Sequence, residues 1–260
     1  MNQDVADRLR RAGCVRAEDE AALLVEAAAT PAALEALVVR RVAGEPIEQV
    51  VGWAEFAGIR VQVAPRVFVP RHRSEHLVTV AAAWLRDHRG RGARPTVVDL
   101  CAGSGALGLA LHHRVGPFAL VAVDLDPDAA ACAARNLAPV GGTALLGDLF
   151  EPLPESLRGR VDLVVANAPY VPSAEVDLLP REAREHEPRQ ALDGGPDGLS
   201  VHRAILATAG DWLGPGAAVA VEVADRQVAA LLDIADRAGL HPSAQPDPAD
   251  RRTVAVVAVR

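Results

Sequence analysis

A turn of four residues has the types and spacing needed to hold an amide group. An apolar run ends at Asn167 and continues with Ala168, Pro169 and Tyr170, the only tyrosine of the chain. An amide nitrogen is a poor nucleophile because its lone pair is delocalised, so a site that modifies it must hold its N–H groups with acceptors. The Asn167 side-chain oxygen and the Ala168 carbonyl can supply those acceptors. Pro169 stiffens the turn and Tyr170 can wall the pocket, although a capped turn that only closes a strand is the alternative.

A glycine-rich stretch, DLCAGSGALG, has the pattern of a ligand-binding turn. Gly103, Gly105 and Gly108 follow an expected strand and lead into an expected helix, as a GxGxxG pattern requires. Glycines let the backbone approach a ligand, and a helix start offers free N–H groups. Asp99 stands four residues before the first glycine. By itself this stretch points equally to a dinucleotide.

Two further aspartates stand at expected strand ends. Asp124 can accept both hydroxyls of a ribose, and Asp148 can accept from an adenine amino group. This favours an adenosine-bearing ligand over a tight turn with solvated carboxylates. The Asn-Ala-Pro-Tyr turn then favours S-adenosylmethionine over NAD, because methyl transfer from a sulfonium to an amide or amine needs only positioning.

The elements that must position these residues alternate between strand and helix. We predict strands over 96–100, 119–124, 143–148, 161–167, 217–223 and 253–259, and helices over 74–88, from about 106, over 128–136 and over 225–238. Continuous β-branched strands alternating with helices are typical of a parallel sheet buried on both faces. The sequence therefore predicts an α/β, Rossmann-like fold. The polar loop 172–198 is long enough to suggest a functional role.

The sequence before residue 74 does not show this alternation of strands and helices. Apolar residues at helical spacing predict helices within 4–44, of which the third is capped by Thr30 and stops near Gly44. Alternation in IRVQV and VFV then predicts two short strands around a turn near Pro65 and Arg66. A helical domain followed by a hairpin connector is expected.

Charge and cysteine content exclude several classes of function. The net charge of −7 argues against a mainly electrostatic nucleic-acid binder. All 27 basic residues are arginine, which excludes the lysine of a Walker A loop and any lysine Schiff base. The three cysteines form no CxxC pair and indicate neither a disulfide framework nor a zinc site. We expect a cytoplasmic protein, because neither a signal segment nor a membrane-spanning run is evident.

The run HRSEH at 72–76 matches the H-x-x-E-H zinc pattern of some peptidases. It follows Pro70 and Arg71 where a helix is expected to begin, and no third ligand is suggested elsewhere. Ser74 or Glu75 would then favour the free N–H groups of that helix start. We therefore expect no metal.

With these motifs assembled, most of the chain resembles the HemK/PrmC family of protein-(glutamine-N5) methyltransferases. The similar stretches are GEPIEQVVGWAEFAGIRVQVAPRVFVPR at 44–71, DLCAGSGALGLAL at 99–111, NAPY in place of the family's NPPY, and EPRQALDGGPDGL at 187–199. The family uses S-adenosylmethionine to modify the glutamine of the GGQ motif in class I release factors. The resemblance implies that Gly103, Asp124 and Asp148 contact the cofactor and that the NAPY turn holds the substrate amide.

The chain departs from the family pattern in three places. Ala168 replaces the first proline of NPPY, which keeps the backbone carbonyl but loosens the turn, so we expect activity to survive. The family's PR-P-x-TE becomes P-R-H-R-S-E, which retains Arg71, Ser74 and Glu75. The N-terminal helical region, where the family engages its protein substrate, is short. These departures concern the identity of the substrate more than the chemistry.

We predict an N-terminal helical substrate-recognition domain over 1–50, a β-hairpin connector over 51–73, and an S-adenosylmethionine-dependent methyltransferase domain over 74–260 with a seven-stranded sheet. The predicted catalytic residues are Asn167, Ala168, Pro169 and Tyr170. The predicted cofactor-binding residues are Asp99, Cys101, Gly103, Gly105, Gly108, Asp124, Leu125, Asp148, Leu149 and Asn167. The predicted substrate-binding residues are Arg71, Glu75, Asn167 and Tyr170. The alternatives are an N-methyltransferase acting on another amide or amine, in a small molecule, peptide or nucleobase, and a non-catalytic cofactor-binding relative.

Overall fold

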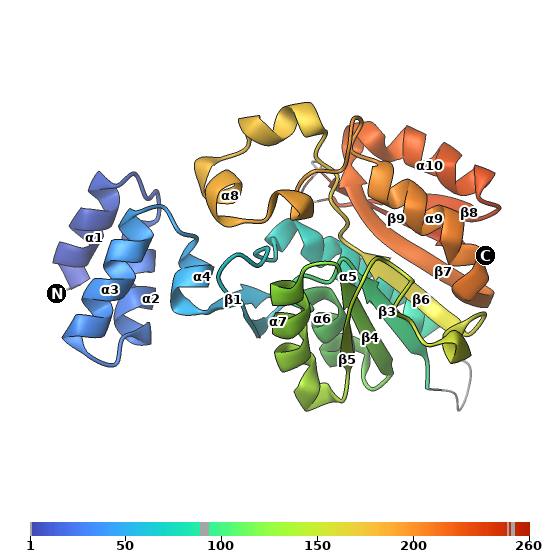
Figure 1. The fold of residues 1–260 in the computed structure, drawn as a ribbon, viewed down its shortest axis with the longest axis horizontal. Coiled ribbons are helices and arrows are strands. Elements are labelled where there is room, and N and C mark those ends of the chain that lie inside the picture. Colours follow the sequence, from blue (N-terminus) through green and yellow to red (C-terminus); the bar gives the residue numbers. More distant parts are fainter. Residues whose placement is uncertain (1, 89–93, 249, 251–252) are drawn as a thin grey trace.

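Three helices at the start of the chain form a small bundle with its own apolar core. The computed structural model describes residues 2–88, 94–248, 250 and 253–260. The bundle consists of α1 (Asn2–Arg11), α2 (Ala17–Ala27) and α3 (Pro31–Val42). As expected, the hydroxyl of Thr30 caps α3 by accepting a hydrogen bond from the N–H of Ala33 at 3.1 Å. Figure 1 shows the bundle beside the sheet, joined to it through α4 (Ile47–Val51).

The hairpin that follows has a different turn from the predicted one. Its strands are β1 (Trp53–Phe56) and β2 (Ile59–Gln62), which pair antiparallel. The turn lies at Ala57 and Gly58, with φ of 50° and 78°, and positive φ at both positions matches the twist of a two-residue hairpin. The predicted turn at Pro65 and Arg66 is present, with the N–H of Val67 donating to the carbonyl of Ala64 at 3.2 Å, but it does not join two strands, because residues 67–69 lie outside any strand. Alternation alone did not distinguish a strand from an extended segment with buried valines.

The remaining strands form one seven-stranded sheet, as predicted. They are β3 (Thr96–Leu100), β4 (Ala119–Asp124), β5 (Thr143–Leu146), β6 (Val161–Ala166), β7 (Leu213–Ala224), β8 (His241–Pro246) and β9 (Thr253–Val259). Their order in space is β5-β4-β3-β6-β7-β9-β8, with β3 to β7 parallel and β9 antiparallel to both of its neighbours. The chain leaves β3 toward β4 and later returns to β6 on the opposite side. The carboxyl ends of these strands therefore meet at a topological switch point, where ligands bind in sheets of this kind.

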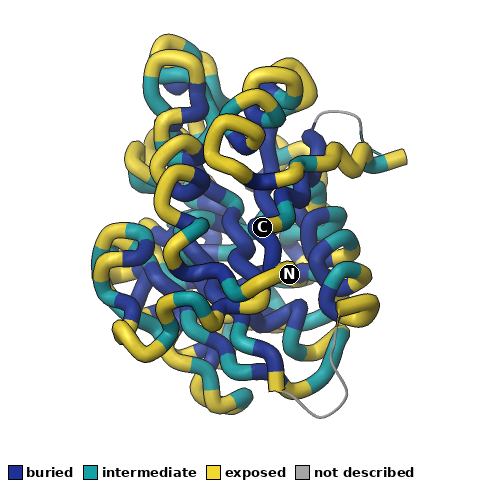
Figure 2. Tube along the Cα trace, turned by 90° about the vertical axis from the view of Figure 1, so that its right-hand side faces the viewer, coloured by how far each residue is buried: buried dark blue, intermediate teal, exposed yellow. Residues whose placement is uncertain are grey.

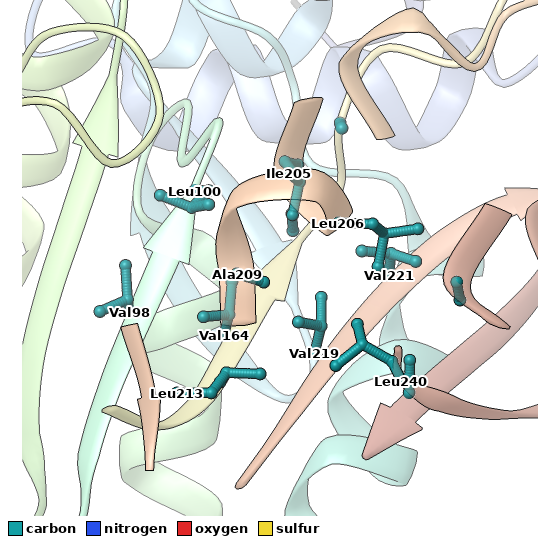
Figure 3. Packing of buried hydrophobic residues seen from close by; sticks show 14 of the residues in the cluster. Val98, Leu100, Val164, Ile205, Leu206, Ala209, Leu213, Val219, Val221 and Leu240 are labelled. Atoms are coloured by element: carbon teal, nitrogen blue, oxygen red, sulfur yellow. The ribbon is translucent and has the colours of Figure 1, made fainter. Parts of the chain in front are cut away.

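Helices cover both faces of the sheet. One face carries α5 (Glu75–His88), α6 (Ala106–Val115) and α7 (Pro127–Leu137), and the other carries α9 (Ser200–Trp212) and α10 (Val228–Arg237). Figure 3 shows the second face, where Ile205 and Ala209 of α9 pack with Val164 of β6 and Val219 of β7. The central strands are buried, and much of the exposed surface lies on helices and loops (Figure 2). The sheet is thus a rigid frame for side chains at its carboxyl edge.

The sequence interpretation located six strands and left out β8 and α9. The β8 sequence HPSAQP contains two prolines and polar residues, and most of it is exposed at the edge of the sheet, where proline is tolerated. Its apolar content is too low for a strand pattern. In contrast, α9 carries a buried stripe at helical spacing through Ile205, Leu206 and Ala209, so the signal was present in the sequence.

The long loop after β6 is partly helical and reaches back toward the bundle. It contains the short helices η4 (Ser173–Leu178), α8 (Arg181–His186) and η5 (Arg189–Ala191). Figure 1 shows α8 between the bundle and the sheet. The side chain of Gln49 in α4 donates to the carbonyls of Val67 at 2.9 Å and His186 at 3.3 Å, and Arg41 of α3 lies 3.6 Å from Glu182. The loop therefore ties the N-terminal bundle to the carboxyl edge of the sheet.

Candidate active site

In the glycine turn between β3 and α6, some glycines are required by close packing and one lies at the cavity. Cys101, Gly103 and Gly105 all have positive φ, of 53°, 56° and 76°. A Cβ on Gly105 would lie 3.2 Å from the Cβ of Ala133, and one on Gly108 would lie 2.8 Å from a methyl of Leu120. Only Gly103 of the three glycines lines the central cavity. Gly103 therefore permits close approach of a ligand, whereas the other two permit close approach of helix and sheet.

The carboxylate of Asp124 holds the glycine turn in place from the end of β4. Its Oδ2 accepts from the N–H of Gly103 at 2.7 Å, and its Oδ1 accepts from the N–H of Asp126 at 2.9 Å. Burial raises the pKa of Asp124, while the backbone N–H groups oppose that rise. Each oxygen keeps a second lone pair, so the carboxylate can still accept from a ligand hydroxyl.

Asp99 lies beneath the turn rather than in the cavity wall. Its side chain is fully buried, and its Oδ2 accepts from the N–H of Gly108 at 2.8 Å. Burial raises the pKa of Asp99 to about 8. Cys101 does line the cavity, but burial and the nearby carboxylates raise the pKa of its thiol. The thiol therefore stays protonated and is not a candidate nucleophile.

One cavity of about 1040 Å³, including its open mouth, brings most of the predicted residues together. Of the predicted residues, Cys101, Gly103, Asp124, Leu125, Asp148, Leu149, Asn167 and Pro169 line it. We call the wall formed by Gly103, Asp124 and Asp148 the cofactor side, and the wall around Asn167 the acceptor side.

Several lining residues were not predicted as contacts. Phe68, Pro70 and Ser74 come from the segment before α5, and Gln190 comes from η5. The amide of Gln190 donates to Asp126 Oδ2 at 2.9 Å, which brings the long loop against the cofactor side. The PR segment and the DGGPDGL loop, both noted in the sequence, contain or adjoin these residues and could have indicated them.

On the acceptor side, the amide of Asn167 is held by one identified partner. Its Nδ2 donates to the hydroxyl oxygen of Ser74 at 3.1 Å. No described residue donates to its Oδ1 or to the carbonyl of Ala168, whose side chain packs in the core. Ala168 is 1% exposed and does not line the cavity, so of these two acceptors only Asn167 Oδ1 belongs to a residue of the cavity wall.

The sole tyrosine lies behind the cavity wall. The hydroxyl of Tyr170 donates to Glu222 Oε1 at 3.1 Å, and the guanidinium of Arg73 lies 5.9 Å from the ring centre. Burial and Glu222 raise the pKa of Tyr170, so the phenol is protonated. We expected Tyr170 to line the cavity, but it does not. It supports the turn from the side away from the cavity.

The DGGPDGL loop fixes the backbone of the same turn. The N–H of Gly194 donates to the carbonyl of Val171 at 2.8 Å, and Gln227 bridges the carbonyls of Tyr170 and Asp197 at 2.9 and 3.0 Å. A Cβ on Gly198 would overlap the carbonyl oxygen of Tyr170. The loop needs glycine here because another backbone lies where a side chain would start.

Arg71 and Glu75, predicted to bind substrate, do not line the cavity. Arg71 donates to both oxygens of Glu187 at 2.6 Å, and Glu187 also accepts from the N–H of Val69 at 3.1 Å. Glu75 accepts from His72 at 2.7 Å and is partly exposed. Arg71 thus joins the PR segment to the long loop, and Glu75 lies near the outer surface.

The described residues contain no cluster of three or more side chains suited to a metal. In the HRSEH run, His72 contacts Glu75, and His76 contacts the carbonyl of Gln245 at 2.8 Å. None of the helices in the described ranges is long and apolar enough to cross a membrane.

Residues 97–186 match a family model described as a methyltransferase domain. A release factor glutamine methyltransferase of Geobacter sulfurreducens is 39% identical over 210 residues, which cover 80% of this chain and 71% of that protein. Another from Streptomyces coelicolor is 41% identical over 191 residues, covering 74% of this chain and 67% of that protein. A 4-amino-L-phenylalanine/4-methylamino-L-phenylalanine methyltransferase of Streptomyces pristinaespiralis is 39% identical over 193 residues, covering 74% and 65%.

Among solved structures, the fold is similar to that of a Thermus thermophilus 16S rRNA N2 G1207 methyltransferase in complex with AdoMet and guanosine. The TM-score is 0.58 at 22% identity, over 80% of this chain and 49% of that chain. At this level of identity the likeness concerns the fold alone.

Proposed function

Because this chain belongs to the family of the release factor glutamine methyltransferases, we propose that it methylates the side-chain amide nitrogen of a protein glutamine with S-adenosylmethionine as methyl donor. The preferred acceptor is the glutamine of the GGQ motif in a peptide chain release factor. The observation that carries this proposal is the arrangement of Asn167. Its Nδ2 is bound to Ser74, and its Oδ1 belongs to a side chain in the wall of the same cavity as the glycine turn.

The cofactor side fits the proposed methyl donor. The backbone at Gly103 can approach the ligand closely, and Asp124 keeps lone pairs for ribose hydroxyls while its position is fixed by two N–H groups. Asp148 and Leu149 would contact the adenine. Asp99 and Gly108 would act indirectly, by holding the turn from below.

On the acceptor side, this chain supplies positioning rather than a reactive group. When bound, the cofactor supplies an electrophilic methyl group on a sulfonium. Asn167 Oδ1 and the Ala168 carbonyl would accept from the two N–H groups of the glutamine amide and turn its nitrogen toward the donor. The neutral Asn167 suits a neutral amide, and the protonated Cys101 leaves no competing nucleophile at the turn.

Methylation of a small aromatic amine is the second candidate. It is favoured by the relative that is named for 4-amino-L-phenylalanine, whose identity of 39% equals that of the release factor enzyme from Geobacter, over 193 rather than 210 residues. An aniline nitrogen also carries two N–H groups, so the same pair of acceptors would hold it. The cavity would then have to take the whole acceptor rather than one side chain of a protein.

The proposed partner and location follow from the acceptor. Phe56 of the hairpin lines the cavity, and α8 contacts the N-terminal part of the chain through Glu182 and Arg41. We propose that a release factor docks on the N-terminal bundle, the hairpin and α8. A cytoplasmic location agrees with a substrate of the translation machinery.

The test is an incubation with labelled S-adenosylmethionine and three acceptors: a release factor with an intact GGQ motif, its Gln-to-Ala variant, and 4-amino-L-phenylalanine. Label on the intact factor alone is the expected result. Label on the amine alone would replace the main proposal with the second candidate. Cofactor binding without label on any acceptor would contradict both candidates and favour the non-catalytic cofactor-binding relative. Absence of cofactor binding would contradict every catalytic proposal.

A further inference from the structure

Arg66 occupies a backbone position that usually belongs to glycine or asparagine. It is the third residue of the turn 64–67, which is closed by the hydrogen bond from the N–H of Val67 to the carbonyl of Ala64 at 3.2 Å. Its φ is 62°, and Pro65 precedes it. Proline in the second position and a positive φ in the third are typical of a type II turn, in which a side chain at the third position is strained. A strained residue of this kind motivates a hypothesis of function.

A buried glutamine holds this turn at the edge of the cavity. Gln49 is 3% exposed, its Oε1 accepts from the N–H of Arg66 at 3.4 Å, and its Nε2 donates to the carbonyl of Val67 at 2.9 Å. On the other side, Val67 packs against Ala129 of α7. The turn is therefore fixed beside the cofactor side of the cavity, where Arg66 is a lining residue.

The Arg66 side chain is exposed, and its guanidinium has no hydrogen-bond or ion-pair partner among the described residues. Arg66 also lines a second hollow next to the cavity, together with three glutamates. Each of these glutamates is already paired with another arginine: Glu45 with Arg40 at 2.7 Å, Glu185 with Arg181 at 2.8 Å, and Glu187 with Arg71 at 2.6 Å. The cation at the turn is thus left for a ligand.

The charges of the main cavity are unbalanced. Asp124, Asp126 and Asp148 line it, and among the described lining residues Arg66 is the only basic one. Carboxylates suit the hydroxyl and amino groups of a ligand, but they repel its carboxylate. S-adenosylmethionine ends in an α-amino acid group, which carries a carboxylate. The planar guanidinium of an arginine matches a carboxylate through two parallel hydrogen bonds.

We propose that Arg66 binds the carboxylate of an α-amino acid group at the edge of the cavity. Two ligands could bring this group: S-adenosylmethionine, and the free amino acid acceptor of the second candidate function. A glutamine within a protein chain has no such carboxylate. The acceptor source rests on the proposed function, whereas the cofactor source rests only on the methyltransferase family. We expect the cofactor source, because the turn lies beside the cofactor side.

The first experiment titrates the full-length protein with S-adenosylmethionine and with decarboxylated S-adenosylmethionine in a calorimeter. In Arg66→Gln we expect the Kd for S-adenosylmethionine to rise by about 10-fold, as for the loss of one charge-assisted hydrogen bond, while the Kd for the decarboxylated form stays within about twofold. Arg160→Gln is the matched control, since it removes the same charge at an exposed position that does not line the cavity. Equal loss of affinity for both ligands, or equal loss in the control, would overturn the proposal.

The second experiment titrates 4-amino-L-phenylalanine and 4-(2-aminoethyl)aniline, which lacks only the carboxylate, into protein saturated with S-adenosylhomocysteine. If the acceptor brings the carboxylate, Arg66→Gln should weaken binding of the amino acid alone and leave the affinity for S-adenosylmethionine unchanged. A variant that loses affinity in neither experiment would overturn the proposal.

Arg66→Gly separates binding from folding. Because glycine adopts a positive φ readily, we expect the urea midpoint to equal or exceed that of the wild type, with the same selective loss of affinity as in Arg66→Gln. A lower midpoint would show that the arginine is retained for stability and would overturn the proposal. If no acceptor is methylated, the proposed function fails, while a selective effect of Arg66→Gln on the cofactor Kd would still support the carboxylate site.

Discussion

On the cofactor side of the cavity, Gly103, Asp124 and Asp148 come from one continuous stretch, 99–149, in which each stands at the end of a different strand or shortly after it. On the acceptor side, Ser74 holds Asn167, Glu222 holds Tyr170, and the DGGPDGL loop holds the backbone of the turn, although these parts lie far apart in the sequence. The first wall is built from backbone N–H groups and a fixed carboxylate. The second is built from hydrogen bonds between side chains of different elements. We therefore expect the two sides to respond separately: changes on the cofactor side should alter affinity, and changes on the acceptor side should alter turnover.

The largest expected effect is on the acceptor side. Asn167→Ala removes one of the two proposed amide acceptors, and we expect turnover to fall by about 100- to 1,000-fold, the usual cost of losing one preorganised hydrogen-bonding group. Affinity for S-adenosylmethionine, measured by calorimetric titration, should stay within about threefold of wild type. Asn2→Ala, at an exposed position of α1, is the control and should leave turnover and affinity unchanged. Wild-type turnover in Asn167→Ala would refute the role assigned to Asn167.

The cofactor side should show the opposite response. Asp124→Ala removes the acceptor of two backbone N–H groups as well as the proposed ribose contact. We expect the Kd for S-adenosylmethionine to rise by about 10- to 100-fold, as for the loss of a charge-assisted hydrogen bond. Asp128→Ala, at an exposed position on α7, should leave the Kd unchanged. Equal Kd values for the two variants would contradict the assignment of Asp124 to the cofactor site.

A backbone change should affect the acceptor side through stability. In Gly198→Ala the new methyl meets the Tyr170 carbonyl at a positive φ of 78°, so we expect a loss of about 1–3 kcal/mol in the free energy of unfolding. Gly210→Ala is the matched control, because its Cβ would have nothing within 4 Å and it lies inside α9. That control should be neutral or gain up to about 1 kcal/mol. Urea denaturation of both proteins measures the difference, and equal midpoints would contradict the close approach at Gly198.

The smallest expected effect is at Ala168, where the family pattern has proline. If this residue contributes through its carbonyl, Ala168→Pro should keep turnover within about threefold of wild type and stabilise the chain by up to about 1 kcal/mol, because proline restricts the unfolded state. Steady-state kinetics and thermal denaturation measure both quantities. A large fall in turnover would indicate that the position has its own backbone requirement.

The same contrast explains how much could be predicted from the sequence. The strands β3, β4 and β9 and the glycine turn are local patterns, so their positions and the cavity-lining role of Asp124 could be predicted from neighbouring residues. Glu222 could not be linked to Tyr170 in this way, because their hydrogen bond depends on β7 pairing with β6. The hairpin turn was misplaced because the alternation at 59–63 and 67–69 is the same. Tyr170 was correctly assigned to the turn, but the sequence did not show on which side of it the ring lies.

The order of the last strands has a consequence for how the polypeptide reaches this structure. β8 precedes β9 in the chain, yet it joins the sheet only through β9, which also pairs with the strand that carries Glu222. During synthesis β8 can therefore join the sheet only after β9 has been made and has paired with β7. Until then, β7 has an unpaired edge of the kind that promotes association between nascent chains. A chain ending before residue 253 would retain every proposed catalytic residue and still lack β9, the partner of β7 at that edge. Ribosome stalling before β9 should thus yield a species that chaperones bind.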